Sequence, residues 1–321
     1  MAGQLWSVNS LGGFFYSLNL SDELRVALQP EARFRQFCDP MDAVGKSKGQ
    51  TFTWDTVQDI ATAGGTLVET NTMPESNFTI IQGTLTVTEY GNSIPYAGKL
   101  EALGKFDVKK PIMTALKNDA KKVFDRAAYA QFYQTPLRVV PTGGTATDAV
   151  TLTTNGTATL TNNVAFSANH AKAIVDTMKE RNIAPYTGDD YMAIAWPTTL
   201  RTFKNNLESL HQYTEAGIKL IFNGEIGRYE NVRYTEQTNV TKGITATGAS
   251  GTAWTNSKSD WIFFLGDDTV AEGVVTPEEI RAKIPTDFGR SKGVAYYYIG
   301  GFGLVHTNAT QARVVMWDSA V

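Results

Sequence analysis

The sequence has little of the chemistry that builds disulfides or metal sites. It contains one cysteine, Cys38, and three histidines, His170, His211 and His306. One cysteine cannot form an intrachain disulfide, and with three scattered histidines it leaves too few soft ligands for structural zinc. We therefore expect neither a metal nor a cofactor.

Long apolar runs are also missing. No stretch approaches the 18 or so apolar residues of a membrane span, and no basic residue precedes Arg25, as an ordinary secretory signal would require. The sequence therefore predicts a protein without a membrane segment that is made and kept in a reducing interior.

Charge is scarce overall, and neither sign dominates. Charged residues make up 19% of the chain, and 29 Lys and Arg stand against 32 Asp and Glu, a formal net charge of -3. This balance excludes a protein that is basic overall, so any DNA contact is local and weak. Low charge with 11% aromatic residues favours a surface committed to partners, although a β-rich monomer would show it too. The 40 threonines indicate much β-structure.

Positive charge is absent altogether from residues 51–98. This segment opens with alternating residues at Thr51–Trp54 and ends in a long run, Phe78–Tyr90, in which Thr84–Thr88 repeats with period two. Two half-buried strands around an irregular tip predict a large hairpin. Five acidic and no basic residues give it a net charge of -5.

The next segment, 99–138, reverses the sign. Nine basic residues stand against four acidic ones, a net charge of +5. Apolar residues recur three and four positions apart from Val108 to Ala127, which is typical of an amphipathic helix. Pro111 fits a first turn and Pro136 lies beyond the end, so we expect one helix over roughly 111–134. Its basic side is either a contact surface or an ordinary solvated face.

The remainder predicts an N-terminal arm and a mixed α/β unit. The arm, 1–49, carries one short helix that Ser21 can cap, the alternative being the first element of a compact domain. A loop rich in Thr, Gly, Ser and Ala is expected to be exposed over 239–259. The expected helices are capped by Ser167, opened by Thr198 and started by the capping box Thr276-Pro277-Glu278-Glu279. The expected strands are Tyr191–Trp196, Trp261–Leu265, Val294–Ile299 and Arg313–Trp317.

Motifs for nucleotide binding are incomplete. Gly45-Lys46-Ser47 ends like a phosphate-binding loop, but Pro40 stands where its first glycine is required. In Gly300-Gly301-Phe302-Gly303, His306 replaces the third glycine of a dinucleotide fingerprint, and close strand packing accounts better for these glycines.

Motifs for catalysis are equally weak. The pairs Asp189-Asp190 and Asp267-Asp268 lie beside glycines, where aspartates usually make turns. Cation binding or acid–base catalysis is the less favoured interpretation of both pairs. We expect no enzyme, and a β-rich hydrolase using Asp189 or Asp267 is the alternative of a different class.

Three segments and the order of parts carry a family resemblance. The segments are Ile94-Pro95-Tyr96-Ala97-Gly98-Lys99 running into the helix from Lys109, Ile183-Ala184-Pro185-Tyr186 before a strand, and Ile226 to Val232. An arm, a long two-stranded loop, a long helix, a small β region, a compact α/β unit and a last strand follow in that order. The chain thus resembles the Hong Kong 97-like major capsid protein of tailed bacteriophages, in its short-tailed phage form.

The resemblance implies an α+β fold of the Hong Kong 97-like type over nearly the whole chain. It implies an N-terminal arm at 1–49, an E-loop hairpin at 50–98, a spine helix and P-domain at 99–162, and an A-domain at 163–303. A C-terminal strand within 304–321 would return to the P-domain.

The resemblance also implies a virion shell that assembles in the host cytoplasm as hexamers and pentamers around double-stranded DNA. In such shells the E-loop lies over a neighbouring subunit, near its spine helix, so a loop of net charge -5 would meet a segment of +5. The candidate intersubunit residues are Asp55, Asp59, Glu69, Glu75 and Glu89 on the loop and Lys105, Lys109, Lys110, Lys117, Lys121, Lys122 and Arg126 on the spine segment.

Two departures limit what the resemblance implies. Residues 51–98 contain no lysine, so the Lys–Asn cross-links of some family members are not expected. Only about 50 residues precede the hairpin, so we expect a separate scaffolding protein rather than a cleaved one. Further expected partners are a portal protein, a decoration protein in some particles, and packaged DNA held by weak non-specific contacts. The alternative within this fold is an encapsulin-like bacterial compartment shell.

Overall fold

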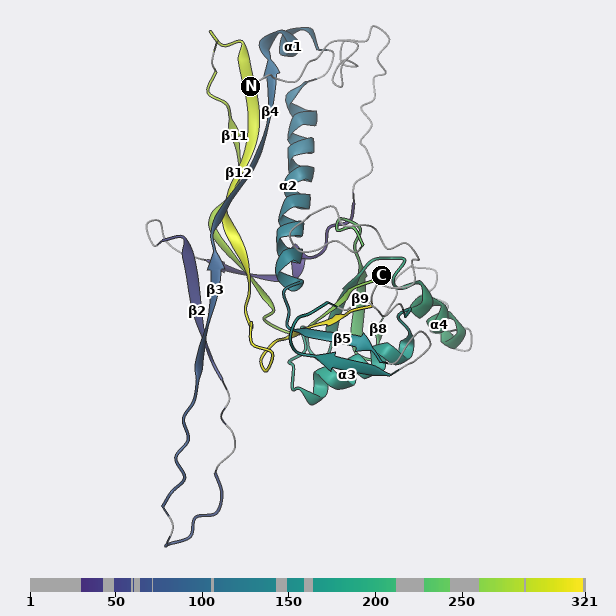
Figure 1. Cartoon of the computed structure of the whole chain (residues 1–321). Coiled ribbons are helices and arrows are strands. Elements are labelled where there is room, and N and C mark those ends of the chain that lie inside the picture. Colours follow the sequence, from purple (N-terminus) through teal and green to yellow (C-terminus); the bar gives the residue numbers. More distant parts are fainter. Residues whose placement is uncertain are drawn as a thin grey trace.

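The computed structural model is an elongated molecule with three parts (Figure 1). A thin two-stranded arm extends from one end, a long sheet with a long helix forms the middle, and a compact α/β unit lies at the side. The structure describes residues 30–42, 49–58, 60, 64–70, 72–104, 107–142, 149–158, 164–211, 228–242, 260–285 and 287–319.

The long sheet has four strands in the order β1-β11-β12-β4. Strand β12 (Ser291–Leu304) is central, antiparallel to both β11 (Val270–Ala282) and β4 (Thr88–Ala97), and β1 (Cys38–Asp42) pairs in parallel with β11. Strands of 10 to 14 residues make this sheet unusually long, and α2 (Lys109–Phe132) lies against it (Figure 1). The short α1 (Gly98–Leu103) links β4 to α2 at the far end.

The expected long helix is confirmed as α2. It begins at Lys109 and ends at Phe132, so Pro111 stands in the first turn, where its missing N–H costs nothing. The apolar spacing buries Ile112, Leu116 and Phe124 against the long sheet and leaves the basic residues on other faces.

The compact unit is built on seven strands in the order β6-β5-β13-β10-β7-β9-β8. Helices α3 (Ala168–Glu180) and α4 (Arg201–His211) share one apolar core with one face of this sheet. The other face packs on the end of α2 and on Phe34. The strands are β5 (Leu137–Pro141), β6 (Val150–Thr153), β7 (Tyr191–Ala195), β8 (Arg228–Tyr229), β9 (Val232–Glu236), β10 (Ile262–Leu265) and β13 (Val314–Trp317).

A sheet covered on both faces explains why its central strands are apolar throughout. In β10, Ile262 and Phe264 join the core under α3 and α4, whereas Phe263 and Leu265 join the core around α2. The strands expected near 191–196, 261–265 and 313–317 are confirmed as β7, β10 and β13. The expected Ser167 cap is also confirmed, because its side chain and that of His170 form a reciprocal capping box at α3.

The arm is a two-stranded ribbon of β2 (Thr51–Val57) and β3 (Ile80–Thr86). The expected second strand is in fact divided: β3 pairs with β2, whereas β4 starts at Thr88 and pairs with β12. Glu89 therefore lies on the long sheet rather than on the arm.

The helix expected from the Thr276–Glu279 capping box is wrong, because these residues lie in strand β11. Pairing with β12 across two register shifts supplies the hydrogen bonds that a helix would have made. The expected exposed loop at 239–259 is also wrong where it is described, since Asn239, Val240 and Lys242 are buried. The short arm helix, Gly45-Lys46-Ser47 and the rest of that loop, from 243, lie outside the described residues.

Strand pairing divides the chain differently from the expected boundaries in two places. Strands β11 and β12, expected within the unit 163–303, belong to the long sheet with β4. Strands β5 and β6, expected beside the spine helix, belong to the seven-stranded sheet, where β13 pairs with both β5 and β10.

Candidate intersubunit surfaces

The arm exposes apolar side chains that no part of its own chain covers in the described structure. Val57, Leu67, Met73, Phe78 and Ile80 are each more than half exposed. Monomeric proteins rarely expose so many large apolar side chains on one thin element, and such patches mark interaction sites. A two-stranded ribbon is also marginal by itself in water.

The acidic residues of the arm are exposed as well. Asp55 lies on β2, where its carboxylate accepts a hydrogen bond from Gln82 on the paired strand at 3.2 Å. Glu69 and Glu75 lie toward the tip and are exposed, and Asp59 lies outside the described residues. The arm therefore presents negative charge and apolar surface together.

The root of the arm is fixed to the long sheet. The indole N–H of Trp54 donates to the backbone oxygen of Val305 at 3.1 Å, and Leu85 is 1% exposed. Glycine is required where the indole lies: a Cβ on Gly83 would come within 2.2 Å of the Trp54 ring, and one on Gly303 would come within 3.1 Å. Close strand packing, the interpretation favoured for the glycines at 300–303, is confirmed.

The basic residues of the spine segment fall into two groups. Lys109 is already paired within the chain, at 2.8 Å from Glu101, which also contacts Lys292 at 2.7 Å. Hydrogen bonds from these two lysines lower the pKa of Glu101 to about 2. Lys110, Lys117, Lys121 and Arg126 are exposed, Lys122 is half-buried, and Lys105 lies outside the described residues.

A large cleft runs beside the exposed lysines of α2. Its volume is about 1100 Å³, and it lies between α2, the chain at 30–40 and strand β11. Lys117 and Lys121 line the α2 side, and Glu278 and Glu279 line the β11 side. The cleft thus has a basic wall and an acidic wall.

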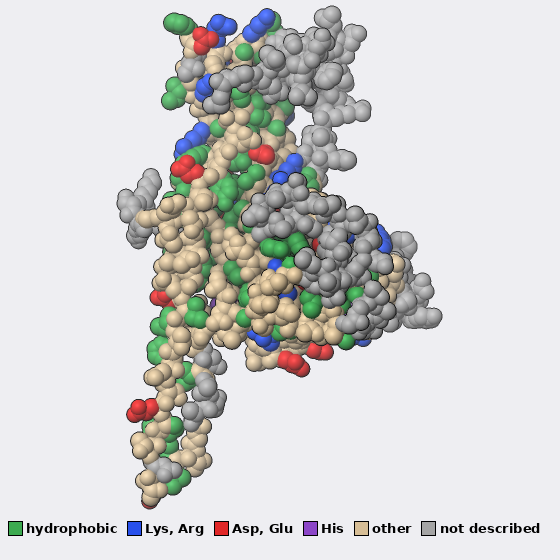
Figure 2. Space-filling view, in the orientation of Figure 1, with side chains coloured by type: hydrophobic (Ala, Val, Ile, Leu, Met, Phe, Trp, Pro, Cys, Tyr) green, Lys and Arg blue, Asp and Glu red, His purple; other side chains and the backbone are tan. Residues whose placement is uncertain are grey.

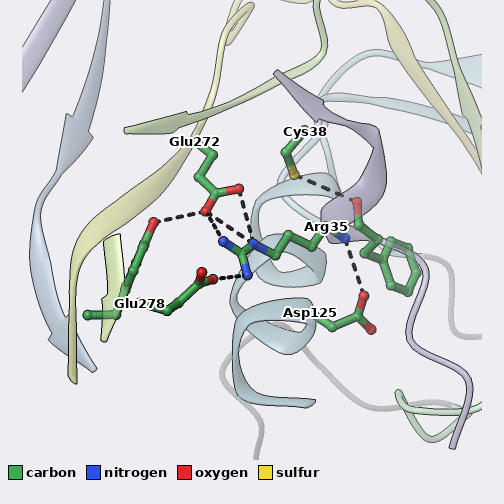
Figure 3. A network of polar contacts seen from close by, with 7 residues as sticks. Arg35, Cys38, Asp125, Glu272 and Glu278 are labelled. Carbon is green, nitrogen blue, oxygen red and sulfur yellow. Dashed lines mark hydrogen bonds and ion pairs between the residues drawn. The ribbon is translucent and has the colours of Figure 1, made fainter. Parts of the chain in front are cut away.

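Members of a polar network line this cleft, and Figure 3 shows the network from close by. The guanidinium of Arg35 donates to both carboxylate oxygens of Glu272, at 2.7 to 3.2 Å, and also pairs with Glu278. The Glu272 side chain is 7% exposed and also accepts a hydrogen bond from the Tyr298 hydroxyl at 2.9 Å. Burial and the Glu272 carboxylate raise the pKa of Tyr298 well above its ordinary value.

The same network anchors the described start of the chain to α2. The backbone N–H of Arg35 donates to the carboxylate of Asp125 at 3.2 Å, and the Asn239 side chain donates to the same carboxylate at 3.1 Å. Burial raises the pKa of Asp125, and these hydrogen bonds oppose that shift. Burial likewise raises the pKa of the Cys38 thiol, which donates to the Phe34 oxygen.

Sequence reasoning missed this network. Its members come from segments up to 237 residues apart, so no local pattern connects them. A partial signal was the β-branched pair Val274-Val275 directly before Thr276, which favours a strand that continues into Thr276.

The two aspartate pairs take part in structural ion pairs. Asp190 is held between Arg228 and Arg233, at 2.6 and 2.8 Å. Asp268 lies 3.3 Å from His306, whose hydrogen bond lowers the pKa of that carboxyl, and its positive φ of 51° is typical of a turn.

The described residues contain no group of three or more His, Cys, Asp or Glu side chains placed to hold a metal ion. None of the helices they form is both long and apolar enough to cross a membrane.

Known proteins resemble this chain in structure rather than in sequence. No protein-family model matches the sequence, and no curated protein matches it significantly. The capsid structure of the cyanophage P-SCSP1u superposes with a TM-score of 0.67 at 12% identity, over 95% of this chain and 93% of that one. The head structure of Helicobacter pylori bacteriophage KHP40 gives 0.67 at 12% identity over 94% of both chains. The capsid of Ralstonia phage GP4 gives 0.60 at 14% identity over 100% of this chain and 99% of that one. The chain therefore has the α+β fold of these phage capsid proteins.

Proposed function

We propose that the chain is the major capsid protein of a tailed bacteriophage and assembles as hexamers and pentamers into an icosahedral shell around double-stranded DNA. The observation that carries this proposal is a capsid fold that matches over 95 to 100% of the chain. An arm with exposed apolar residues, anchored only at its root, supports it further.

The parts of the molecule take family names under this proposal. The β2–β3 arm corresponds to the E-loop, α2 to the spine helix and the four-stranded sheet to the P-domain. The seven-stranded sheet with α3 and α4 corresponds to the A-domain. Support comes from the pairing pattern, which separates the two sheets and leaves the arm as a third element.

The arm of one subunit would dock beside the α2 helix of its neighbour. Lys117 and Lys121 present positive charge along one wall of the cleft, and Asp55, Glu69 and Glu75 present negative charge on the arm. Complementary charge of this kind acts mainly on encounter rate and register, while apolar burial supplies most of the affinity. Lys109 contributes less than the sequence suggested, because Glu101 already pairs with it.

The test is assembly of a charge-reversed protein, followed by electron microscopy. The double variant Lys117→Glu/Lys121→Glu should form few or no empty shells, while the melting temperature of its subunit changes little, since exposed charges contribute about 0 to 1 kcal/mol. The matched control is Lys172→Glu/Lys179→Glu, which reverses two exposed lysines on α3. If the variant forms normal empty shells but packages DNA poorly, Lys117 and Lys121 instead neutralise DNA phosphates inside the shell.

The compartment-shell alternative shares the fold and differs in cargo. The structures compared above are phage capsids, which favours the virion shell. Nuclease-protected double-stranded DNA in purified particles is the expected result, and particles filled with a protein cargo would favour the compartment.

We also propose that the shell role needs no catalysis. Support comes from the ion pairs of Asp190 and Asp268, which give one aspartate of each pair a structural role. Replacing Asp189 and Asp267 with asparagine should leave particle formation unchanged.

The remaining partners follow from the proposed shell. A separate scaffolding protein would direct assembly in the host cytoplasm, a portal protein would occupy one vertex, and a decoration protein would bind some mature particles. Expression of the chain with and without the scaffolding protein tests the role of that protein. Uniform shells are expected only when the chain and the scaffolding protein are expressed together.

A further inference from the structure

The loop that joins β11 to β12 carries the most exposed apolar residues of the described chain. Phe288 is fully exposed, at 107% of its reference area, and Ile284 is 83% exposed. The loop lies at the end of the molecule opposite the arm tip, beside α1, where hydrophobic side chains protrude among charged ones (Figures 1 and 2). It is therefore distinct from the arm and from the cleft beside α2.

The backbone of this loop is strained in a way that holds Phe288 outward. The N–H of Arg290 donates to the oxygen of Asp287 at 3.0 Å, and the two residues between them have φ values of 51° at Phe288 and 86° at Gly289. Positive φ at both central residues is typical of a type I′ turn, in which Asn, Asp or Gly is strongly preferred at the first position, and Asp287 before them also has a positive φ of 55°. A bulky aromatic residue there is an outlier, and such strain is typical of functional positions.

A pocket of about 340 Å³ opens next to this turn. Pro95, Tyr96, Ala97 and Gly98 form one wall, where β4 runs into α1. Asp287, Arg290 and Ser291 of the turn form the other. The N–H of Gly98 donates to the oxygen of Arg290 at 2.9 Å, which fixes the turn relative to the pocket. The volume is within the range of sites that take a small aromatic group.

We propose that Phe288 of one subunit inserts into this pocket of a second copy of the chain. The inference rests on the proposed shell function, because it requires copies whose loop ends meet. Charge complementarity supports the second copy as the occupant. Asp287 precedes the ring and is exposed, and its pairing with Arg290 of its own chain is long, at 3.7 Å. The receiving pocket is lined by that Asp287–Arg290 pair and by Lys99, an exposed lysine that forms no ion pair with any described residue and can therefore pair with the incoming Asp287.

The ring and the pocket lie at the same end of the subunit, and this constrains how the copies are arranged. The inserting ring and the receiving pocket lie on the same end of each subunit, so each copy can give a ring to one neighbour and receive one from another. A contact of this heterologous type closes into a ring when the copies are related by a rotation axis. Two copies would exchange rings mutually, and three or more would form a cycle.

The variant Phe288→Asn tests the contact, because it should not destabilise the unassembled subunit and yet should weaken shell assembly. Asparagine suits the turn, so the melting temperature of the unassembled subunit should stay the same or rise. The concentration needed for shell formation should rise at least tenfold, because the inserted ring is lost. Phe288→Tyr keeps the ring and should assemble like the wild type. Equal assembly of the wild type and Phe288→Asn would overturn the inference, whereas a wild type that forms no particles would contradict the proposed function itself.

A second measurement detects the contact directly. Chains with Phe288→Cys are mixed with chains with Ala97→Cys, assembled and treated with a short bismaleimide, and each single variant alone controls for the buried native Cys38. A cross-linked dimer only in the mixture is expected, and a chain that carries both substitutions should give a closed product whose size counts the copies in the ring. Assembled shells without the mixed dimer would assign the exposed ring to another partner, such as a decoration protein, and overturn the proposal.

Discussion

Replacing Arg35 with methionine tests whether the buried network holds the described start of the chain to the long sheet. Methionine keeps an unbranched apolar side chain over the Phe124 ring, which lies 4.8 Å from the guanidinium carbon, but it removes every donor to Glu272 from this position. Among the described residues, Glu272 would keep only the Tyr298 hydroxyl as a donor and would stay buried.

The expected cost follows from the burial of each partner. Breaking a buried ion pair by removing one member costs about 3 to 5 kcal/mol, because the other charge is left uncompensated. Since the Arg35 side chain is 33% exposed, the lower end applies, and we expect a loss of about 3 kcal/mol or roughly 4 to 5 °C in melting temperature. Glu278 is 43% exposed, so Glu278→Gln should cost less than about 1 kcal/mol.

The decisive variant is the double replacement Arg35→Met/Glu272→Gln. A neutral glutamine removes the uncompensated charge and can still accept from Tyr298, so the double variant should regain about 1 to 2 kcal/mol relative to Arg35→Met. Urea and thermal unfolding of dilute, unassembled subunits measure all four proteins. A double variant no more stable than Arg35→Met, or an equal loss from Glu278→Gln, would refute the assignment of the energy to the buried pair.

Two further predictions concern the arm and the α1 end. Deleting the tip of the arm between Gly64 and Glu75 should leave a folded subunit with a nearly unchanged melting temperature but abolish shells, because the tip is exposed throughout its described residues; normal particles would contradict the arm assignment. Glu101→Gln should lower the melting temperature at pH 6 and have little effect near pH 2. The ordinary pKa of 4.5 is lowered to about 2 in the folded state, so the stabilising contribution of the carboxylate is present above 4.5 and is lost as the pH falls toward 2. A loss that is equal at both pH values would contradict this pairing with Lys109 and Lys292.

The sequence was sufficient where local pattern and tertiary environment agree. Helix α2 follows from the apolar spacing and the proline in its first turn. Ile112 and Leu116 of the expected stripe are buried, whereas Ala115 is exposed and Asp125, outside the stripe, is buried. Strands β10 and β13 follow from short, fully apolar runs, because a sheet buried on both faces needs no alternation.

Where the local sequence pattern and the tertiary environment disagree, strand pairing determines the secondary structure. The segment Thr276–Glu279 has a good local helix start, yet Glu278 pairs with Arg35, and Ile280 stands opposite Tyr296 in the ladder. In the same strand the Arg281 guanidinium lies 3.9 Å from the centre of the Tyr297 ring. Such contacts with residues far away in the sequence outweigh a propensity of less than about 1 kcal/mol per residue.

Charge patterns were informative about segments but not about individual residues. The contrast between 51–98 and 99–138 is a property of composition and is visible without a structure. That Lys109 is paired within the chain, while Lys117 and Lys121 line a cleft, depends on where α1 places Glu101. The Arg35 network and the Phe288 turn could not be predicted from the sequence, since each requires knowing which strands are neighbours.

The contrast between the two ends of the arm has a physical rationale under the proposed function. Association costs free energy because the partners lose translational and rotational freedom and because mobile segments become ordered. The Trp54 indole, held by Val305 and seated over Gly83 and Gly303, fixes the direction in which the arm leaves the long sheet before any partner is present. Part of the ordering is thus completed during folding of the subunit, while Met73 and Phe78 remain available for burial against a neighbour. A fixed root with an exposed, apolar tip is therefore the arrangement that favours docking without stabilising the arm against its own chain.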